Sequence, residues 1–135
     1  MHRIAATPGG WNPATDGVII LDQTPAPIII LTAADTEIQT LAASLPQLPQ
    51  DFPQFRVASL LQLQQELSID TYVDSVLSKA KVIVVRLLGG RSYWSYGLER
   101  LREIAELYDI RLVVLPGDDR PDPVLCSLGT VPLTV

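Results

Sequence analysis

Runs of apolar residues alternate along this chain with segments in which apolar residues recur every three or four positions. The runs at 28–31, 82–88 and 111–115 are rich in Val, Ile and Leu at successive positions. Such runs are typical of strands that are covered on both faces, as in a parallel sheet. The short apolar stretch at 18–21 and the segment 55–58 predict two further strands.

The segments between the strands have helical spacing. After the Gly89–Gly90 turn, apolar residues from Trp94 to Tyr108 share one predicted helix face, and the opposite face is charged. The segments that begin at Thr32 and at Ser59 have the capping-box form that starts a helix. The predicted helices are 32–45, 59–67, 70–80 and the segment that follows Gly90 up to residue 108.

Alternating strands and helices of these lengths predict βαβ units. We therefore expect one α/β domain over residues 1–135, with an irregular arm at 1–15. Its fold class is an open, mainly parallel sheet with helices on both faces, a Rossmann-like or flavodoxin-like three-layer arrangement. In such sheets ligands bind at the carboxyl ends of the strands, near a topological switch point.

Composition and charge narrow the possible functions. Hydrophobic residues make up 47% of the 135 residues and charged residues 19%, which is typical of a globular core. The net charge of −5, with ten scattered Lys and Arg, argues against binding to nucleic acid. The apolar runs are shorter than the ~18 residues that span a bilayer. We expect a cytoplasmic protein with no membrane partner.

Few residues of the chain suit metal binding or nucleophilic catalysis. The single cysteine, Cys126, excludes an internal disulfide and a cysteine-based zinc cluster. The single histidine, His2, lies in the predicted arm, so a histidine metal site or catalytic triad is not expected. Dinucleotide and phosphate-loop glycine motifs are absent from the sequence. We predict no metal site and no resident cofactor, and the residues identify no catalytic group.

Arg86 is the most unusual residue, because it stands near the end of a buried apolar run. A guanidinium is costly to bury unless it is paired. In one interpretation Arg86 and Arg91 form an anion site beside the start of the following helix. In the other, Arg86 makes a structural ion pair with Asp118 or Asp119 of the neighbouring loop.

Aromatic residues cluster directly after the Gly89–Gly90 turn. Trp94 falls on the apolar helix face and is expected in the core, which leaves Tyr93 and Tyr96 as the freer candidates. Aromatic faces beside arginine suit a flat ring that carries carboxylates. Asp118 and Asp119, in the acidic loop after the last strand, are open to two interpretations: contact with a cation or arginine, or a solvated turn.

The run from Val84 to Gly97, VVRLLGGRSYWSYG, resembles the amino-terminal region of CobN-type cobaltochelatase large subunits. The stretches 30–36, 115–119 and 1–4 agree with that region in order and spacing. The resemblance covers essentially the whole chain. Members of the family are many times longer, so the resemblance implies an amino-terminal fragment of a larger chelatase subunit.

The resemblance also implies a function. Such subunits hold a tetrapyrrole while AAA+ partner subunits hydrolyse ATP with Mg²⁺, and a divalent metal enters the ring. For the CobN type the tetrapyrrole is hydrogenobyrinic acid a,c-diamide and the metal is Co²⁺, in aerobic cobalamin biosynthesis. The implied partners are the remainder of the large subunit, the AAA+ subunits and the corrin precursor. Metal insertion by these 135 residues alone is not expected.

The residues that we expect to contact the substrate lie at the end of the second buried run and in the segments that follow the second and third buried runs. They are Arg86, Gly89, Gly90, Arg91, Tyr93, Tyr96, Asp118 and Asp119. Two alternatives to the cobaltochelatase assignment stay open at this point. In the first, the chain is a domain of a magnesium-chelatase H-type subunit. In the second, it is a non-catalytic interaction or scaffold domain.

Overall fold

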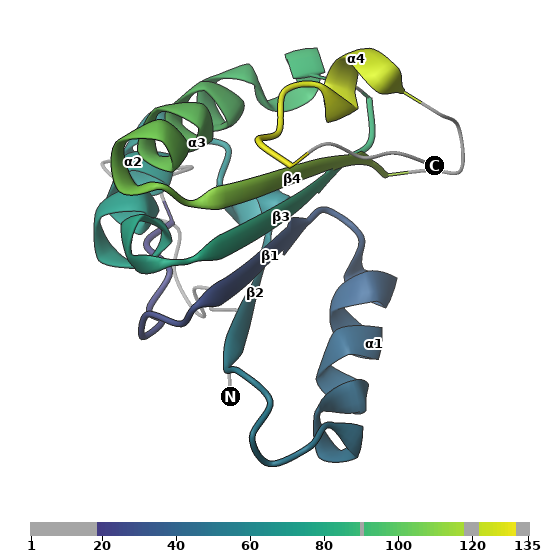
Figure 1. Ribbon diagram of the computed structural model, residues 1–135. Helices are drawn as coiled ribbons and strands as arrows, with labels where there is room; N and C mark the ends of the chain where they lie inside the picture. Colours follow the sequence, from purple (N-terminus) through teal and green to yellow (C-terminus); the bar gives the residue numbers. More distant parts are fainter. Residues whose placement is uncertain (1–18, 90, 118–121, 132–135) are drawn as a thin grey trace, which may run out of the picture.

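Four parallel strands form the sheet of this protein (Figure 1). The computed structural model describes residues 19–89, 91–117 and 122–131. Within these ranges the strands are β1 (Ile28–Thr32), β2 (Phe55–Ser59), β3 (Val82–Leu87) and β4 (Arg111–Pro116). Their order in the sheet is β2-β1-β3-β4, and every neighbouring pair is parallel. The four predicted strands from residue 28 onward and the parallel sheet are confirmed.

Helices cover both faces of this sheet, as the three-layer prediction requires (Figure 1). One face carries α1 (Asp35–Ser44), and the other carries α2 (Glu66–Ser75) and α3 (Ser95–Tyr108). A short helix, α4 (Pro123–Cys126), contacts β4. The connections contain the 3₁₀ turns η2 (Leu45–Gln47), η3 (Leu60–Gln62), η4 (Leu77–Lys79) and η5 (Arg91–Trp94). Among the described helices, none has the length and apolar character needed to cross a membrane.

The strand predicted at 18–21 does not form in its described part. Residues 19–21 are irregular, and the backbone N–H of Ile19 donates to the Ser68 hydroxyl at 2.9 Å. Leu21 is buried in the main core. The apolar character of this stretch therefore reflects packing against the core, and not pairing within the sheet. Residue 18 and the predicted arm at 1–15 lie outside the described residues.

The two capping-box predictions had different outcomes. The helix expected from Thr32 begins at Asp35, and its N-cap, Ala34, makes no side-chain cap. The Thr32 hydroxyl accepts a hydrogen bond from the Ala34 N–H at 3.3 Å. Ser59 does cap its turn, since its hydroxyl accepts from the Leu61 N–H at 3.2 Å, but only the short turn η3 follows. Helix α2 then begins at Glu66, four residues before the predicted start at 70.

The apolar face of α3 packs as predicted over most of its length. Trp94, Leu98, Leu101 and Ala105 are buried in the main core. Tyr108, predicted on the same face, is 54% exposed. It occupies the last turn, where Asp109 takes a left-handed conformation (φ 56°) and the helix ends. Helical spacing alone does not indicate where a helix extends beyond the core against which it packs.

The two faces of the sheet differ in burial. On the face towards α2 and α3, eight strand side chains are at most 1% exposed: Ile29, Leu31, Ala58, Ile83, Val85, Leu87, Leu112 and Val114. On the α1 side, the apolar side chains of β1, β3 and β4 are only half-buried: Ile28, Ile30, Val82, Val84, Val113 and Leu115. Val57 of β2, on the same side, is 0% exposed. In the core, the strands pack with side chains of α2 and α3. The main core therefore lies on one side of the sheet.

Candidate functional site

The carboxyl ends of β1 and β3 form the topological switch point of the sheet. The two strands are neighbours, and Thr32 pairs in register with Arg86. From β1 the chain passes through α1 to β2 at one edge, and from β3 through α3 to β4 at the other. Because the connections leave in opposite directions, this edge is the usual ligand position in such sheets.

Three polar side chains from these strand ends bind one another. The Arg86 guanidinium forms an ion pair with Glu37 in the first turn of α1. The Thr32 hydroxyl, which is 2% exposed, donates a 2.5 Å hydrogen bond to the same carboxylate. The side chains of Arg86 and Glu37 remain 34% and 26% exposed. A buried hydroxyl and a half-exposed arginine thus hold Glu37 at the switch point.

The ion-pair interpretation of Arg86 therefore holds, with a different partner from the two acids considered. Asp118 and Asp119 lie outside the described residues. The Arg86 Nε–H also donates to the Pro116 carbonyl at 3.4 Å, which connects β3 to the end of β4. The sequence contained one signal for Glu37, since it is an acid in the first turn of a helix that follows a central strand.

The loop after β3 presents apolar surface at this edge. Leu88 is 59% exposed and Tyr93 is 43% exposed. Gly89 has φ +99°, a conformation that L-residues with a side chain rarely adopt. Gly90 lies outside the described residues, and so does the side chain of Arg91, whose backbone begins η5. Of the predicted contact residues, the structure thus places Arg86 near the end of β3, and Gly89 and Tyr93 in the connection that follows it.

A close backbone approach joins this loop to the end of β4. The Gly117 N–H donates to the Leu87 carbonyl at 2.7 Å. A Cβ atom at residue 117 would lie 2.9 Å from the Leu88 nitrogen, which is closer than real Cβ atoms come. Only glycine fits there without a shift of the backbone. The position of Leu88 therefore depends on the residue that follows β4.

Tyr96 is not one of the free aromatic groups at this edge. Its hydroxyl donates to Asp70 of α2, with O···O distances of 2.8 and 3.0 Å to the two carboxylate oxygens. Arg100 Nε also donates to Asp70, at 2.9 Å. The hydrogen bond to the carboxylate raises the pKa of Tyr96 above its usual value near 10. Tyr96 thus contributes to the contact between α2 and α3. Predicting this role from sequence would have required knowing that these two helices pack together.

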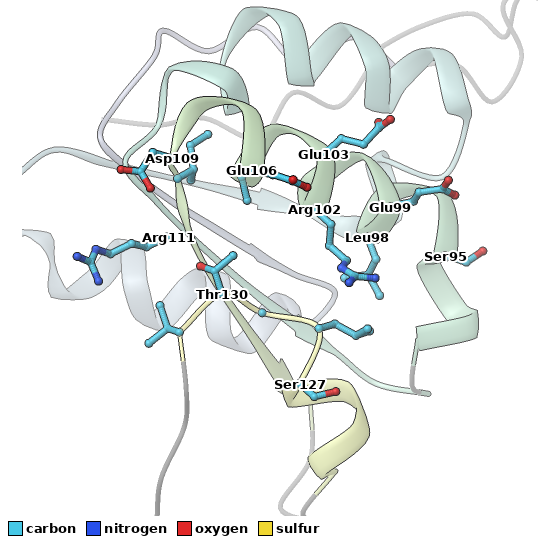
Figure 2. A pocket seen from close by; sticks show the side chains of 15 residues that line it. Ser95, Leu98, Glu99, Arg102, Glu103, Glu106, Asp109, Arg111, Ser127 and Thr130 are labelled. Carbon is cyan, nitrogen blue, oxygen red and sulfur yellow. The ribbon is translucent and has the colours of Figure 1, made fainter.

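A groove that sequence reasoning missed lies along α3 (Figure 2). It has a volume of about 1160 Å³ and runs between α3 and the segment 127–131. Its charged lining residues are Glu99, Arg102, Glu103, Glu106, Asp109 and Arg111. The charged face of α3 was the available signal in the sequence. In the described ranges, no group of three or more His, Cys, Asp or Glu is placed to hold a metal ion.

The chain is similar to subunits of one enzyme. It is 46% identical over 132 residues to the aerobic cobaltochelatase subunit CobN of Pseudomonas aeruginosa. It is 44% identical over 131 residues to the subunit of the same name from a Sinorhizobium species. These alignments cover 98% and 97% of this chain but 10% of each relative. The chain thus spans about a tenth of the length of the curated relatives that it matches. No family model matches it.

A solved structure has a similar fold. The catalytic subunit of cobaltochelatase from Mycobacterium tuberculosis superposes with a TM-score of 0.58 over 77% of this chain and 8% of that one. The two sequences are 22% identical in this comparison. The superposition supports the fold alone. The similarity to the two CobN subunits rests on sequence identity and does not depend on this superposition.

Proposed function

On the premise that this chain is a homologue of the amino-terminal domain of the CobN-type cobaltochelatase subunit, we propose that it serves as one domain of such a subunit. In this role it forms one wall of the site that holds hydrogenobyrinic acid a,c-diamide during Co²⁺ insertion. The observation that carries the proposal is the identity of 46% and 44% to two such subunits over nearly the whole chain. Because both relatives are cobalt-type subunits, the cobalt role is preferred to a magnesium-chelatase role.

The edge formed by the carboxyl ends of β1 and β3 has suitable chemistry for this ligand. A corrin precursor is a broad apolar ring with carboxylates and amides around its rim. Leu88 and Tyr93 offer exposed apolar surface, and Arg86 offers a cation that is 34% exposed. Gly90, Arg91, Asp118 and Asp119 complete the proposed set. Later domains of the subunit would supply the opposite wall.

In this proposal, the free energy of ATP hydrolysis and the metal ion both come from outside this domain. In the proposed complex, AAA+ subunits hydrolyse ATP with Mg²⁺, and Co²⁺ is a substrate. This chain would bind and orient the ring, and catalytic groups for metal insertion belong to the remainder of the subunit. Cobalamin biosynthesis in the cytoplasm is the corresponding setting.

A fluorescence titration with hydrogenobyrinic acid a,c-diamide tests the ligand role. A Trp11→Phe background leaves Trp94, next to the proposed wall, as the sole tryptophan. We expect added ligand to quench its emission, and Tyr93→Ala and Arg86→Ala to raise Kd about tenfold, or about 1.4 kcal/mol. The matched controls are Tyr108→Ala and Arg100→Ala, which alter an exposed tyrosine and an arginine of α3. Equal Kd values for all four variants would refute the proposed wall.

A scaffold or interaction role is the second candidate, and one observation favours it. Arg86 is already engaged by Glu37, so its charge is partly neutralised without a ligand. If the edge is only structural, Arg86→Ala lowers the free energy of unfolding but leaves the affinity for the corrin precursor unchanged. Equilibrium unfolding and the titration, carried out on the same variant, therefore distinguish the two functions.

A further inference from the structure

We propose that the half-buried sheet face beside α1 is the docking surface for an amphipathic helix from the remainder of the large subunit. This inference rests on the part of the proposed function that makes the chain a domain of a longer polypeptide. It does not depend on tetrapyrrole binding. We call this surface the open face; it comprises Ile28, Ile30, Val82, Val84, Val113 and Leu115.

The burial pattern along each strand identifies the open face. In β3, Val85 is 0% exposed and its neighbour Val84 is half-buried. In β4, Val114 is 0% exposed and Val113 is half-buried. Ile30, Val84 and Val113 lie side by side in register across three strands. The open face is therefore a continuous β-branched surface, with the composition of a strand face that is covered.

The width of the sheet leaves room for a second helix beside α1. Neighbouring strands are about 4.8 Å apart, so four strands span roughly 15–20 Å, and packed helices lie about 8–10 Å apart. Two helices thus fill one face, as α2 and α3 do on the opposite side (Figure 1). Helix α1 contacts β1 and β2, and Ile38 is its one fully buried residue among those described. The strip over β3 and β4 is the part of this layer that α1 leaves open.

The length of the relatives indicates what covers this strip. The chain spans 10% of the two cobaltochelatase subunits that it matches, so most of such a subunit lies outside the matching segment and is available to contact it. An apolar face of several β-branched side chains is a preferred place for such a contact. Strands of six residues extend about 20 Å, which corresponds to a helix of roughly 13 residues. An amphipathic helix of that length fits the strip alongside α1.

Two matched pairs of variants test whether the face is open in this chain. Val84→Thr and Val113→Thr place a hydroxyl on the open face, and Val85→Thr and Val114→Thr place it in the main core. We expect the first pair to lower the thermal midpoint by no more than a few degrees and the second pair by clearly more, because a buried hydroxyl loses its hydrogen bonds with water. If the open-face pair and the core pair lowered the thermal midpoint equally, this chain itself would already cover the face, and the proposal would be overturned.

Cysteine labelling then tests what covers the face. In a Cys126→Ser background, Val84→Cys and the control Leu107→Cys, at a position 71% exposed on α3, are treated with a maleimide. The reaction is repeated in the full-length Pseudomonas aeruginosa subunit with this chain in place of its matching segment. We expect the Val84→Cys rate to fall more than tenfold in the subunit and the Leu107→Cys rate to change little.

Two outcomes of this second test would overturn the proposal. One is an unchanged Val84→Cys labelling rate in the full-length subunit. The other is protection of the isolated chain that rises with its own concentration, since a second copy would then cover the face. Neither measurement involves the corrin precursor, so a failure of tetrapyrrole binding and a failure of this proposal remain distinguishable.

Discussion

The indole nitrogen of Trp94 donates a 2.7 Å hydrogen bond to the backbone carbonyl of Leu63, 31 residues earlier in the chain. Trp94 is 4% exposed and Leu63 is 1% exposed, so water has little access to either group. The bond ties the turn before α3 to the connection between β2 and α2. It fixes the base of the loop that presents Leu88 and Tyr93.

Trp94→Phe removes the donor and leaves the Leu63 carbonyl buried without this partner. A buried acceptor that loses its partner costs about 1–3 kcal/mol, and the smaller ring leaves a cavity in addition. We expect the free energy of unfolding in urea to fall by at least about 2 kcal/mol. Tyr93→Phe, at an exposed neighbouring position, serves as the control and should change stability little. A loss below about 0.5 kcal/mol for Trp94→Phe would contradict the structural role of this bond.

Gly97→Ala tests the contact between α3 and the Trp94 ring. In an open helix this substitution stabilises by up to about 1 kcal/mol. Here a Cβ atom on residue 97 would overlap the indole ring, so we expect destabilisation, and the sign of the change is the test. Ser95→Ala, at an exposed position in the first turn of the same helix, should be neutral or slightly stabilising. A gain in stability for Gly97→Ala, measured in the same urea titration, would show that the ring moves aside easily.

Tyr72 should make the folded protein sensitive to alkaline pH. Burial raises its pKa well above the usual value near 10, and the nearby Arg56 opposes this only in part. Below pH 10 both the folded and the unfolded state keep the proton, and the stabilisation is fully present. Above pH 10 the unfolded state releases the proton first, so stability falls by about 1.4 kcal/mol per pH unit until the folded-state pKa is reached.

The measurement is the pH dependence of the unfolding free energy above about pH 9 in wild type and Tyr72→Phe. The variant loses the 2.5 Å hydrogen bond to Gln23, so it should be less stable at neutral pH, yet its stability should decline less steeply with rising pH. Tyr108→Phe, at an exposed position, should keep the wild-type slope. Parallel curves for wild type and Tyr72→Phe would contradict the assignment.

A double-mutant cycle on Arg86 and Glu37 measures their ion pair. Because both side chains are about a third exposed, solvent screens the interaction, and we expect a coupling of about 0.5–1 kcal/mol that decreases with added salt. The matched cycle pairs Arg86→Ala with Asp35→Ala, at an exposed acid in the same helical turn. The effects of these two substitutions on the free energy of unfolding should be close to additive. Additivity in both cycles would mean that the ion pair contributes nothing to stability.

The sheet was largely predictable from sequence because β1, β3 and β4 are mostly apolar runs between breaks. The runs around Ile30, Val84 and Val113 indicated parallel strands, and these form, but their side chains on the α1 side are only half-buried. The stretch at 18–21 has the same composition, yet its described part packs on the core without joining the sheet. An apolar composition indicates that a segment is buried. To form a strand, the segment must in addition lie beside a strand edge that has no other partner.

The polar contacts at the candidate site could not be predicted from sequence. Arg86 pairs with Glu37 only because β1 lies beside β3, and strand order is not encoded in local spacing. For the same reason the bond between Tyr96 and Asp70 depends on the packing of α2 against α3. Sequence reasoning placed the candidate contact residues Arg86, Gly89 and Tyr93 at the end of β3 and in the turn that follows it, which is where they lie. It did not identify the partners that other elements bring to that loop.

The strand order β2-β1-β3-β4 also constrains how the chain reaches its native state. No two neighbouring strands are joined by a hairpin, because parallel neighbours need a long crossover connection. Folding must therefore close long loops, which makes it slower than the folding of a helical bundle. One edge of β1 stays unpaired until β3 has been synthesised and inserted beside it, and an unpaired edge is a template for pairing with another chain. During the interval on the ribosome between β1 and β3, this unpaired edge is thus available for pairing with another chain.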